Sequence, residues 1–294
     1  MEGIGIGDFC ITNLRYSDNA ILVADKRKKI QKMIDRLSKT CKEQGMEINV
    51  KKTKVIVMNG LGKIKQLEKI KQHVKLNNVP LERVTRFKYL GSWITDEARS
   101  DDDIKARVGL AKAAFWQNKE LMRRNIRFKT KLKILNTYVF SVLNYGCESW
   151  TWNVAMFKKV DAFEMWCYRR ILKINWFDGV SNAEVLNRIH TKLHFREDMM
   201  KRKVRYAGHV LRGSSGLTHL QILEGPIEEK RKVGSPRRTW MKDIMEWIDW
   251  NNKNNTGEKY GTYSMVKRIA EKKNRWKLIV VNLLDDGDDN LLID

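Results

Sequence analysis

The chain has 294 residues, which is enough to bury a sizeable core in one unit with appendages or in two units. Lys and Arg number 58 against 35 Asp and Glu, so the formal net charge is +23, far more than solubility requires. The cations are spread along the whole chain and interleaved with aromatic residues, which favours nucleic acid over a membrane surface as the partner.

Targeting and redox patterns point to the inside of the cell. No run of about 18 uncharged apolar residues occurs, so a transmembrane helix is excluded. The start of the chain lacks the basic and apolar segments of a signal peptide. The four cysteines form no C-x-x-C pair, which is typical of reduced thiols and not of a disulfide scaffold. We therefore expect an intracellular protein, in the nucleus or the cytoplasm, with no membrane partner.

The first predicted element is a β-hairpin in NLRYSDNAILVAD, residues 13–25. Apolar residues lead into and out of Asp18 and Asn19, so the pattern predicts two buried strands with these polar residues at the tip. Asp and Asn are common in such turns because they tolerate positive φ, so a purely structural turn is one interpretation. The wider sequence has to decide between that interpretation and a functional one.

A helix and several strands are predicted next. The helix has Asp25 as its expected N-cap and Gly45 as its stop, because the apolar residues between them fall on one face. An alternating stretch then predicts one strand, or two with a bend at 51–52, and two more short strands follow around residues 84–93.

Most of the remaining chain is predicted to be helical. Apolar stripes at helical spacing lie within residues 104–115, 132–142 and 160–171. A capping box opens a short helix at Ser181, and a basic helix ends at Gly213. Two further helices are predicted at about 240–250 and about 263–284, ahead of an acidic tail.

Tryptophan side chains in helical or near-helical stretches normally fill core volume, and we expect the same here. The tryptophans concerned are Trp116, Trp150, Trp152, Trp166 and Trp176. His190 and His194 have a spacing that could serve zinc together with a cysteine. Because zinc sites usually draw on two tight pairs of ligands, packing or surface roles are favoured for these histidines.

Together these elements predict an α+β fold that is predominantly α-helical, with a small antiparallel sheet followed by a helical bundle. We divide the chain into residues 1–97, 98–213, 214–238 and 239–294. The third segment carries prolines, glycines and clustered cations, which is typical of a basic connector. We expect the small sheet to expose an unpaired edge.

The order of motifs in the first hundred residues resembles motifs C, D and E of a reverse transcriptase palm. They are a Tyr-x-Asp hairpin, an amphipathic helix, an Asn-x-x-Lys-Thr-Lys strand and a Tyr-Leu-Gly hairpin. Later segments, such as VLNYGCESWTW, VRYAGHVLR and GSPRRTW, resemble the helical region that follows the palm. The chain is similar to the C-terminal part of the reverse transcriptase of a non-LTR retrotransposon, LINE-type and RTE-like. The resemblance implies a truncated palm over residues 1–97 and a thumb-like helical domain over 98–213.

For catalysis, the resemblance assigns Asp18 as the first acid of a degenerate motif C, together with Tyr16, Ser17 and Asn19. Polymerases of this kind join a primer to a nucleotide with two Mg²⁺ ions held by several carboxylates. Here Asn19 replaces the second acid of motif C, and motif A would lie upstream of residue 1. Asp18 is therefore a weak candidate Mg²⁺ ligand. We expect Mg²⁺ as cofactor if the chain is active and none otherwise, and we expect the isolated chain to be an inactive RNA-directed DNA polymerase fragment.

Binding can persist where catalysis is lost, and RNA or an RNA–DNA hybrid is the expected ligand. The candidate nucleic-acid-binding residues are Lys52, Lys54, Lys88, Tyr89, Gly91, Arg123, Arg124, Arg127, Arg237 and Arg238. Further cations at Lys201, Arg202, Lys203 and Arg205 could line a backbone as well. Charge runs on helices are commonly solvated faces, and this remains the structural alternative. The alternative function is a non-catalytic nucleic-acid-binding or interaction protein derived from the same element.

Overall fold

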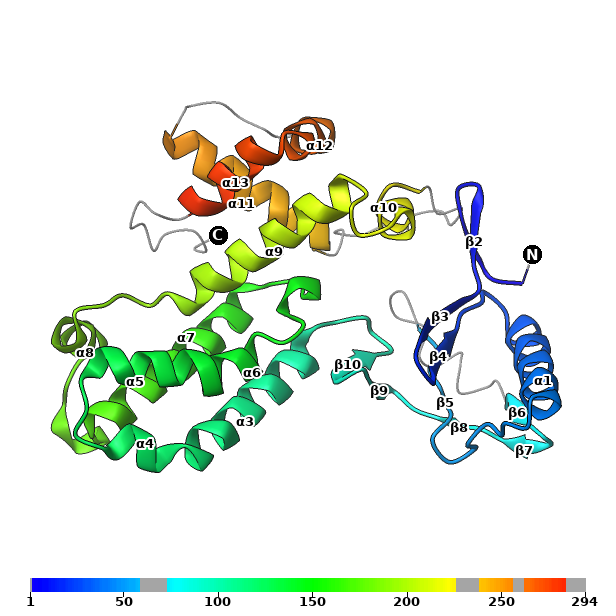
Figure 1. The fold of residues 1–294 in the computed structure, drawn as a ribbon, viewed down its shortest axis with the longest axis horizontal. Helices are drawn as coiled ribbons and strands as arrows, with labels where there is room; N and C mark the ends of the chain where they lie inside the picture. Colours follow the sequence, from blue (N-terminus) through cyan, green and yellow to red (C-terminus); the bar gives the residue numbers. More distant parts are fainter. Residues whose placement is uncertain (1, 59–72, 226–237, 256–261, 284–294) are drawn as a thin grey trace. The chain divides into compact units, whose positions relative to one another are not determined.

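A computed structural model of the chain describes residues 2–58, 73–225, 238–255 and 262–283 (Figure 1). The chain forms two compact units. The first comprises Met1–Arg99 and Ser215–Ser235, and the second comprises Ser100–Ser214 and Pro236–Asp294.

The strands of the first unit form two-stranded sheets, most of them antiparallel hairpins. The hairpins are β1 (Ile4–Ile6) with β2 (Phe9–Ile11), β3 (Asn13–Tyr16) with β4 (Asn19–Leu22), β6 (Lys75–Leu76) with β7 (Val79–Pro80), and β9 (Arg86–Tyr89) with β10 (Ser92–Thr95). The parallel pair is β5 (Lys54–Val55) with β8 (Glu82–Arg83). Each strand in the described part of the chain pairs on one side, so the expected unpaired edges are present.

The predicted helix of the first unit is α1 (Arg27–Glu43). Gly45 ends it with φ of +69°, and the backbone N–H of Met46 donates to the carbonyl of Cys41 at 2.8 Å, as in a Schellman motif. The expected N-cap is wrong, because Lys26 occupies that position. Asp25 instead forms an ion pair with Lys29 at 2.8 Å, one turn into the helix.

The core of this unit lies between α1 and the β6–β7 hairpin. Leu76 is fully buried against a cluster that includes Ile34 of α1. The side chain of Gln31 donates to the carbonyl of Lys75 and accepts from its N–H, both at 2.8 Å, and so docks the helix on the strand. Asn77 and its neighbour both have positive φ, which gives the hairpin a turn that matches the twist of its strands.

Two strand predictions need correction. The hairpin of β3 and β4 forms as predicted, but its strands are not buried, and Tyr16 is 65% exposed. The alternating stretch after the first helix keeps only the short strand β5. The predicted bend is confirmed, because the side chain of Asn49 accepts from the N–H of Lys52 at 3.0 Å and closes a turn there.

The second unit is helical. Its helices are α3 (Asp101–Gln117), α4 (Lys119–Arg123), α5 (Phe128–Ile134), the π-helix η1 (Leu135–Phe140), α6 (Ser141–Leu143), the short turn η2 (Cys147–Ser149), α7 (Val154–Leu172), the short turn η3 (Trp176–Asp178), α8 (Asn182–Ile189), α9 (Phe195–Leu211), α11 (Trp240–Asn255), α12 (Tyr263–Glu271) and α13 (Lys273–Asn282). The short helix α10 (Leu217–Glu224) belongs to the first unit. The last predicted helix is in fact two helices, which meet at Lys272.

Helix α9 is the central helix of this unit and packs against α7, α11, α12 and α13 (Figure 1). Two predicted helix boundaries are confirmed: Ser181 caps the start of α8 by accepting from the N–H of Glu184 at 3.1 Å, and Gly213 follows the end of α9 with φ of +69°. In the stripe predicted on α7, all four side chains are buried, from Val160 to Ile171. The periodicity of the sequence therefore identified the core-facing side of this helix.

Between η2 and α7 an extended segment carries two tryptophans into the core. Trp150 and Trp152 are almost fully buried, and their rings meet edge to face. The indole N–H of Trp150 donates to Asp103 of α3 at 2.8 Å. The core prediction is wrong for Trp176, which is 91% exposed, and Trp116 is 45% exposed.

The architecture confirms an α+β chain that is mainly helical with small sheets. None of the helices in the described ranges has the length and apolar character needed to cross a membrane.

Candidate nucleic-acid interface

The tip of the β3–β4 hairpin is formed by Ser17 and Asp18, one residue earlier than predicted. Tyr16 pairs with Asn19 across the strands, and Ser17 has φ of +53°. The amide of Asn19 donates to Asp18 Oδ1 at 3.3 Å. All four residues of the degenerate motif are exposed.

These residues do not fit a pair of magnesium ions. Mg²⁺ prefers several carboxylate oxygens around it, and two neighbouring ions need more negative charge still. Asp18 supplies one carboxylate, and the side chain beside it turns an amide N–H toward it. Within the part of the chain that the structure describes, no three His, Cys, Asp or Glu side chains gather to form a metal site. We therefore derive no catalytic step at this hairpin.

The other candidate residues of the first unit lie on separate elements. Lys52 is exposed in the turn before β5, whereas Lys54 forms an ion pair with Glu82 of β8. Lys88 is exposed on β9. Gly91 has φ of +86° in the tight turn after Tyr89, where a glycine is favoured for its freedom at positive φ.

A dense group of cations belongs to α4, α5 and the loop that joins them. Arg123 lies 3.9 Å from Glu120, a weak and exposed pair. The other cations of this segment have no carboxylate partner among the described residues. They are Arg124, Arg127, Lys129, Lys131 and Lys133, and we call them, together with Arg123, the α4–α5 basic segment.

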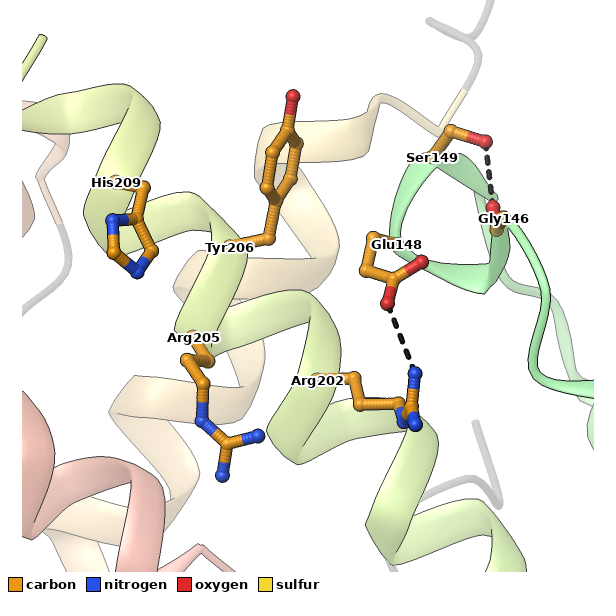
Figure 2. A pocket seen from close by; sticks show the side chains of 7 residues that line it. All are labelled: Gly146, Glu148, Ser149, Arg202, Arg205, Tyr206 and His209. Carbon is orange, nitrogen blue, oxygen red and sulfur yellow. Dashed lines mark hydrogen bonds and ion pairs between the residues drawn. The ribbon is translucent and has the colours of Figure 1, made fainter. Parts of the chain in front are cut away.

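A second basic surface lies on one face of α9. Arg202, Arg205, Tyr206 and His209 recur at helical spacing and project from this face (Figure 2). The turn η2 lies opposite them, and together they line a shallow pocket of about 510 Å³.

Charge within this pocket is partly offset. Glu148 of η2 faces Arg202 at 3.3 Å (Figure 2). Arg205 forms no ion pair with the described residues. Burial, with Glu148 nearby, raises the pKa of Tyr206, so its hydroxyl stays protonated and can donate. The pocket therefore presents a free guanidinium and a phenol to the surface.

The structure describes only the last part of GSPRRTW, from Arg238 onward. Arg237 lies outside the described residues. Arg238 is ion-paired with Asp243 and Glu246 of α11. Trp240 packs in the fold, and its indole N–H donates to the carbonyl of Glu148 at 2.7 Å. Phosphate binding by Arg238 stays a prediction, and a phosphate would have to compete with these two carboxylates for the guanidinium.

Lys203 does not belong to the surface at all. Although it lies among exposed cations on α9, its side chain is fully buried and forms an ion pair with Asp243. Burial lowers its pKa to about 8, and Asp243 only partly offsets this effect. It is a structural group, and it contributes nothing to the exposed charge.

The buried carboxylate of Glu164 binds the backbone at His194. Glu164 of α7 accepts from the backbone N–H groups of His194 and Phe195, both at 3.2 Å, and so caps the start of α9. The hydroxyl of Tyr168 donates to the same carboxylate at 2.6 Å. Burial raises the pKa of Glu164, while the neighbouring histidine opposes that change. This network is a structural cap.

The thiols of Cys147 and Cys167 are buried and unreactive. Burial raises the pKa of Cys147 to about 12 and raises that of Cys167 as well, so both stay protonated. Cys10 and Cys41 are partly exposed, and all four cysteines are free.

Some exposed residues near these surfaces were not predicted from the sequence. Tyr206 and His209 follow Arg202 at helical spacing, and this regularity could have identified the face of α9. Trp176 and Phe177 form the exposed tip of η3, a position that no local pattern predicts.

Comparisons with known proteins give one informative relationship. No protein-family model matches the chain, and no solved structure is significantly similar to it. A protein of Caenorhabditis elegans, named as uncharacterized and transposon-derived, is 27% identical over 277 residues, which cover 92% of this chain and 95% of that protein. The similarity supports an origin of this chain from a transposable element.

Proposed function

We propose that this protein is a nucleic-acid-binding derivative of a retrotransposon reverse transcriptase, which binds RNA or an RNA–DNA hybrid and does not polymerise DNA as an isolated chain. The proposal rests on one observation above the others: within the α4–α5 basic segment, the cations other than Arg123 have no carboxylate partner among the described residues. The transposon-derived relative and the resemblance to palm motifs C to E support it.

The charge of this segment is hard to explain as a merely solvated helix face. Residues 119–133 contain seven Lys and Arg and a single Glu. Lys129 and Lys133 stand one turn apart on α5, a like-charge arrangement that destabilises a helix by roughly 0.2–0.5 kcal/mol. A solvated face is usually laced with opposite charges, whereas a surface that binds a polyanion recovers this cost on binding.

Salt dependence tests the proposal directly. Fluorescence anisotropy with a labelled RNA–DNA hybrid should give a log K that falls linearly with log salt concentration, by roughly 0.9 per phosphate contact on duplex DNA. The triple variant Arg124→Gln, Arg127→Gln, Lys131→Gln should bind more weakly and reduce the slope by roughly 2 to 3. A flat salt response of the wild-type chain would overturn the proposal.

A matched control separates this site from bulk charge. Lys105, Arg188 and Lys242 are surface cations of the same unit that already lie beside carboxylates. Changing these three to Gln removes the same net charge, so the triple control should keep most of the affinity and the slope. An equal loss in both triple variants would mean that net charge, and not the α4–α5 basic segment, governs binding.

The catalytic part of the proposal has its own test. Purified chain, template, labelled primer and nucleotides are combined with Mg²⁺ or Mn²⁺, and products are resolved on a gel. We expect no primer extension. Metal-dependent extension that Asp18→Ala abolishes would show that the hairpin is catalytic.

A further inference from the structure

The turn η3 places two aromatic side chains almost wholly in solvent. Trp176 is 91% exposed and Phe177 is 94% exposed. The same unit buries Trp150, Trp152 and Trp247 to within 1% of complete burial. Aromatic side chains of this size normally sit in cores or interfaces, so an adjacent exposed pair points to a binding surface.

The tip is held rigidly from within. The N–H of Asn175 donates to Asp178 Oδ2 at 2.6 Å, and the Asn175 side chain accepts from the N–H of Asp178 in return. Gly179 follows with φ of +62°. The two aromatic residues therefore project from a turn whose first and last residues are hydrogen-bonded to each other.

The tip is also anchored to the helices on either side. The N–H of Ile174 donates to the carbonyl of Arg169 at 2.9 Å, which ends α7. Arg169 itself donates to the carbonyl of Val180 and to Asn182 Oδ1, both at 2.8 Å, and so ties the far end of the loop to α7 and α8. Such a preorganised tip loses little conformational freedom when it binds a partner.

The surroundings of the tip are cationic. Residues 169–181 contain Arg169, Arg170 and Lys173 but a single acid, Asp178, whose carboxylate already accepts a backbone N–H. The ring of Phe128, at the start of α5, lies 6.5 Å from that of Tyr168 on α7. This contact brings the α4–α5 basic segment to the end of α7 from which the tip extends.

An apolar pair within a cationic surface fits a partner that offers both phosphates and flat apolar faces. We propose that Trp176 and Phe177 stack on unpaired bases of a nucleic acid whose backbone is held by neighbouring cations. Base stacking on aromatic side chains tolerates any sequence, because every base has a π-face. The inference rests on the proposed function and adds the recognition of unpaired nucleotides.

The test compares two ligands with one pair of variants. The ligands are a blunt RNA–DNA hybrid and the same hybrid with a single-stranded tail that contains 2-aminopurine. Trp176→Ala with Phe177→Ala should lower the affinity for the tailed hybrid by roughly 5- to 150-fold for each stacked base and abolish the 2-aminopurine fluorescence change. Affinity for the blunt hybrid should stay unchanged. Trp176→Tyr with Phe177→Tyr should restore both signals for the tailed hybrid.

The outcomes separate this inference from the proposed function. If the wild-type chain binds both ligands with a steep salt dependence, and the alanine variant binds both equally well, base stacking is wrong and the proposed function stands. If the wild-type chain shows no salt-dependent binding, the proposed function is wrong, and so is the inference that rests on it. Loss of self-association in the alanine variant, with unchanged binding of the tailed hybrid, would make the tip a protein contact and overturn the inference. Because both side chains are exposed, the variants should keep the wild-type circular dichroism spectrum.

Discussion

Lys203 of α9 and Asp243 of α11 form an ion pair in which both side chains are fully buried. Lys203 also donates to the carbonyl of Trp150 at 2.7 Å. Asp243 accepts from the N–H of Trp152 at 3.0 Å and from Arg238. The pair thus joins two helices to the extended segment that carries both tryptophans, and both carboxylate oxygens of Asp243 accept hydrogen bonds.

Removing the carboxylate should destabilise the second unit strongly. Asp243→Ala leaves the Lys203 ammonium in the core without its partner, which costs about 3–5 kcal/mol of the free energy of unfolding. Chemical denaturation followed by tryptophan fluorescence measures this loss. Glu184→Ala is the control, since it breaks the exposed pair with Arg188 and should cost less than about 1 kcal/mol. Equal losses would mean that the buried pair contributes no more than a surface pair.

The lowered pKa of Lys203 predicts how stability changes with pH. The folded chain releases this proton near pH 8 and the unfolded chain near 10.5, so the unfolded chain binds more protons between these values. The contribution of Lys203 therefore makes the free energy of unfolding rise from about pH 8 to about pH 10.5. Denaturation curves of the wild type and of Lys203→Met are measured across this range. The difference between their free energies of unfolding gives the contribution of Lys203, because the other groups contribute equally to both. A difference that falls with pH would contradict the lowered pKa.

The parts of the fold that follow from local rules were predictable. Gly45 and Ser181 act within one turn of their own helix, so the sequence alone locates these boundaries. The β6–β7 hairpin was missed, although its Asn77–Asn78 pair is a typical turn sequence. Burial is different, because it depends on which distant segment covers a side chain. Helical periodicity places Lys203 on the buried face of α9 with Met200 and Ala207. No local pattern, however, identifies Asp243 as its partner or assigns Trp176 to solvent.

The same distinction applies to the candidate interface. The α4–α5 basic segment was recognisable because Glu120 is the single acidic residue within residues 119–133. Arg238 looked equally available, but its partners Asp243 and Glu246 become evident only with the helical register of α11. Charge density in sequence therefore identifies a cationic surface only where no folded neighbour neutralises it.

Two glycine substitutions should change stability in opposite directions. A Cβ at Gly208 would lie 2.3 Å from Nε1 of Trp276, whose buried indole N–H donates to the carbonyl of Val204 at 3.0 Å. Overpacking of this kind costs about 1–3 kcal/mol. Gly109 in α3 has open space around its Cβ position, so Gly109→Ala should stabilise the helix by about 0.5–1 kcal/mol. Thermal unfolding of the two variants checks the signs, and a stabilising Gly208→Ala would refute the tight α9–α13 contact.

The last prediction concerns the hairpin that carries the degenerate motif. Asn19→Asp restores a second carboxylate beside Asp18 and removes the amide that donates to it. We expect the variant to bind Mn²⁺ more tightly than the wild type in calorimetry, because hard cations prefer paired carboxylates. We still expect no primer extension, since Asp18 belongs to no group of three or more potential metal ligands among the described residues.

Asp18→Asn combined with Asn19→Asp is the matched control for this experiment, because it moves the single carboxylate without changing the charge. It should bind Mn²⁺ no better than the wild type. Primer extension by the Asn19→Asp chain would show that two carboxylates on this hairpin suffice for metal-assisted transfer. The inactivity that we propose for the isolated chain would then be due to the Asn19 amide.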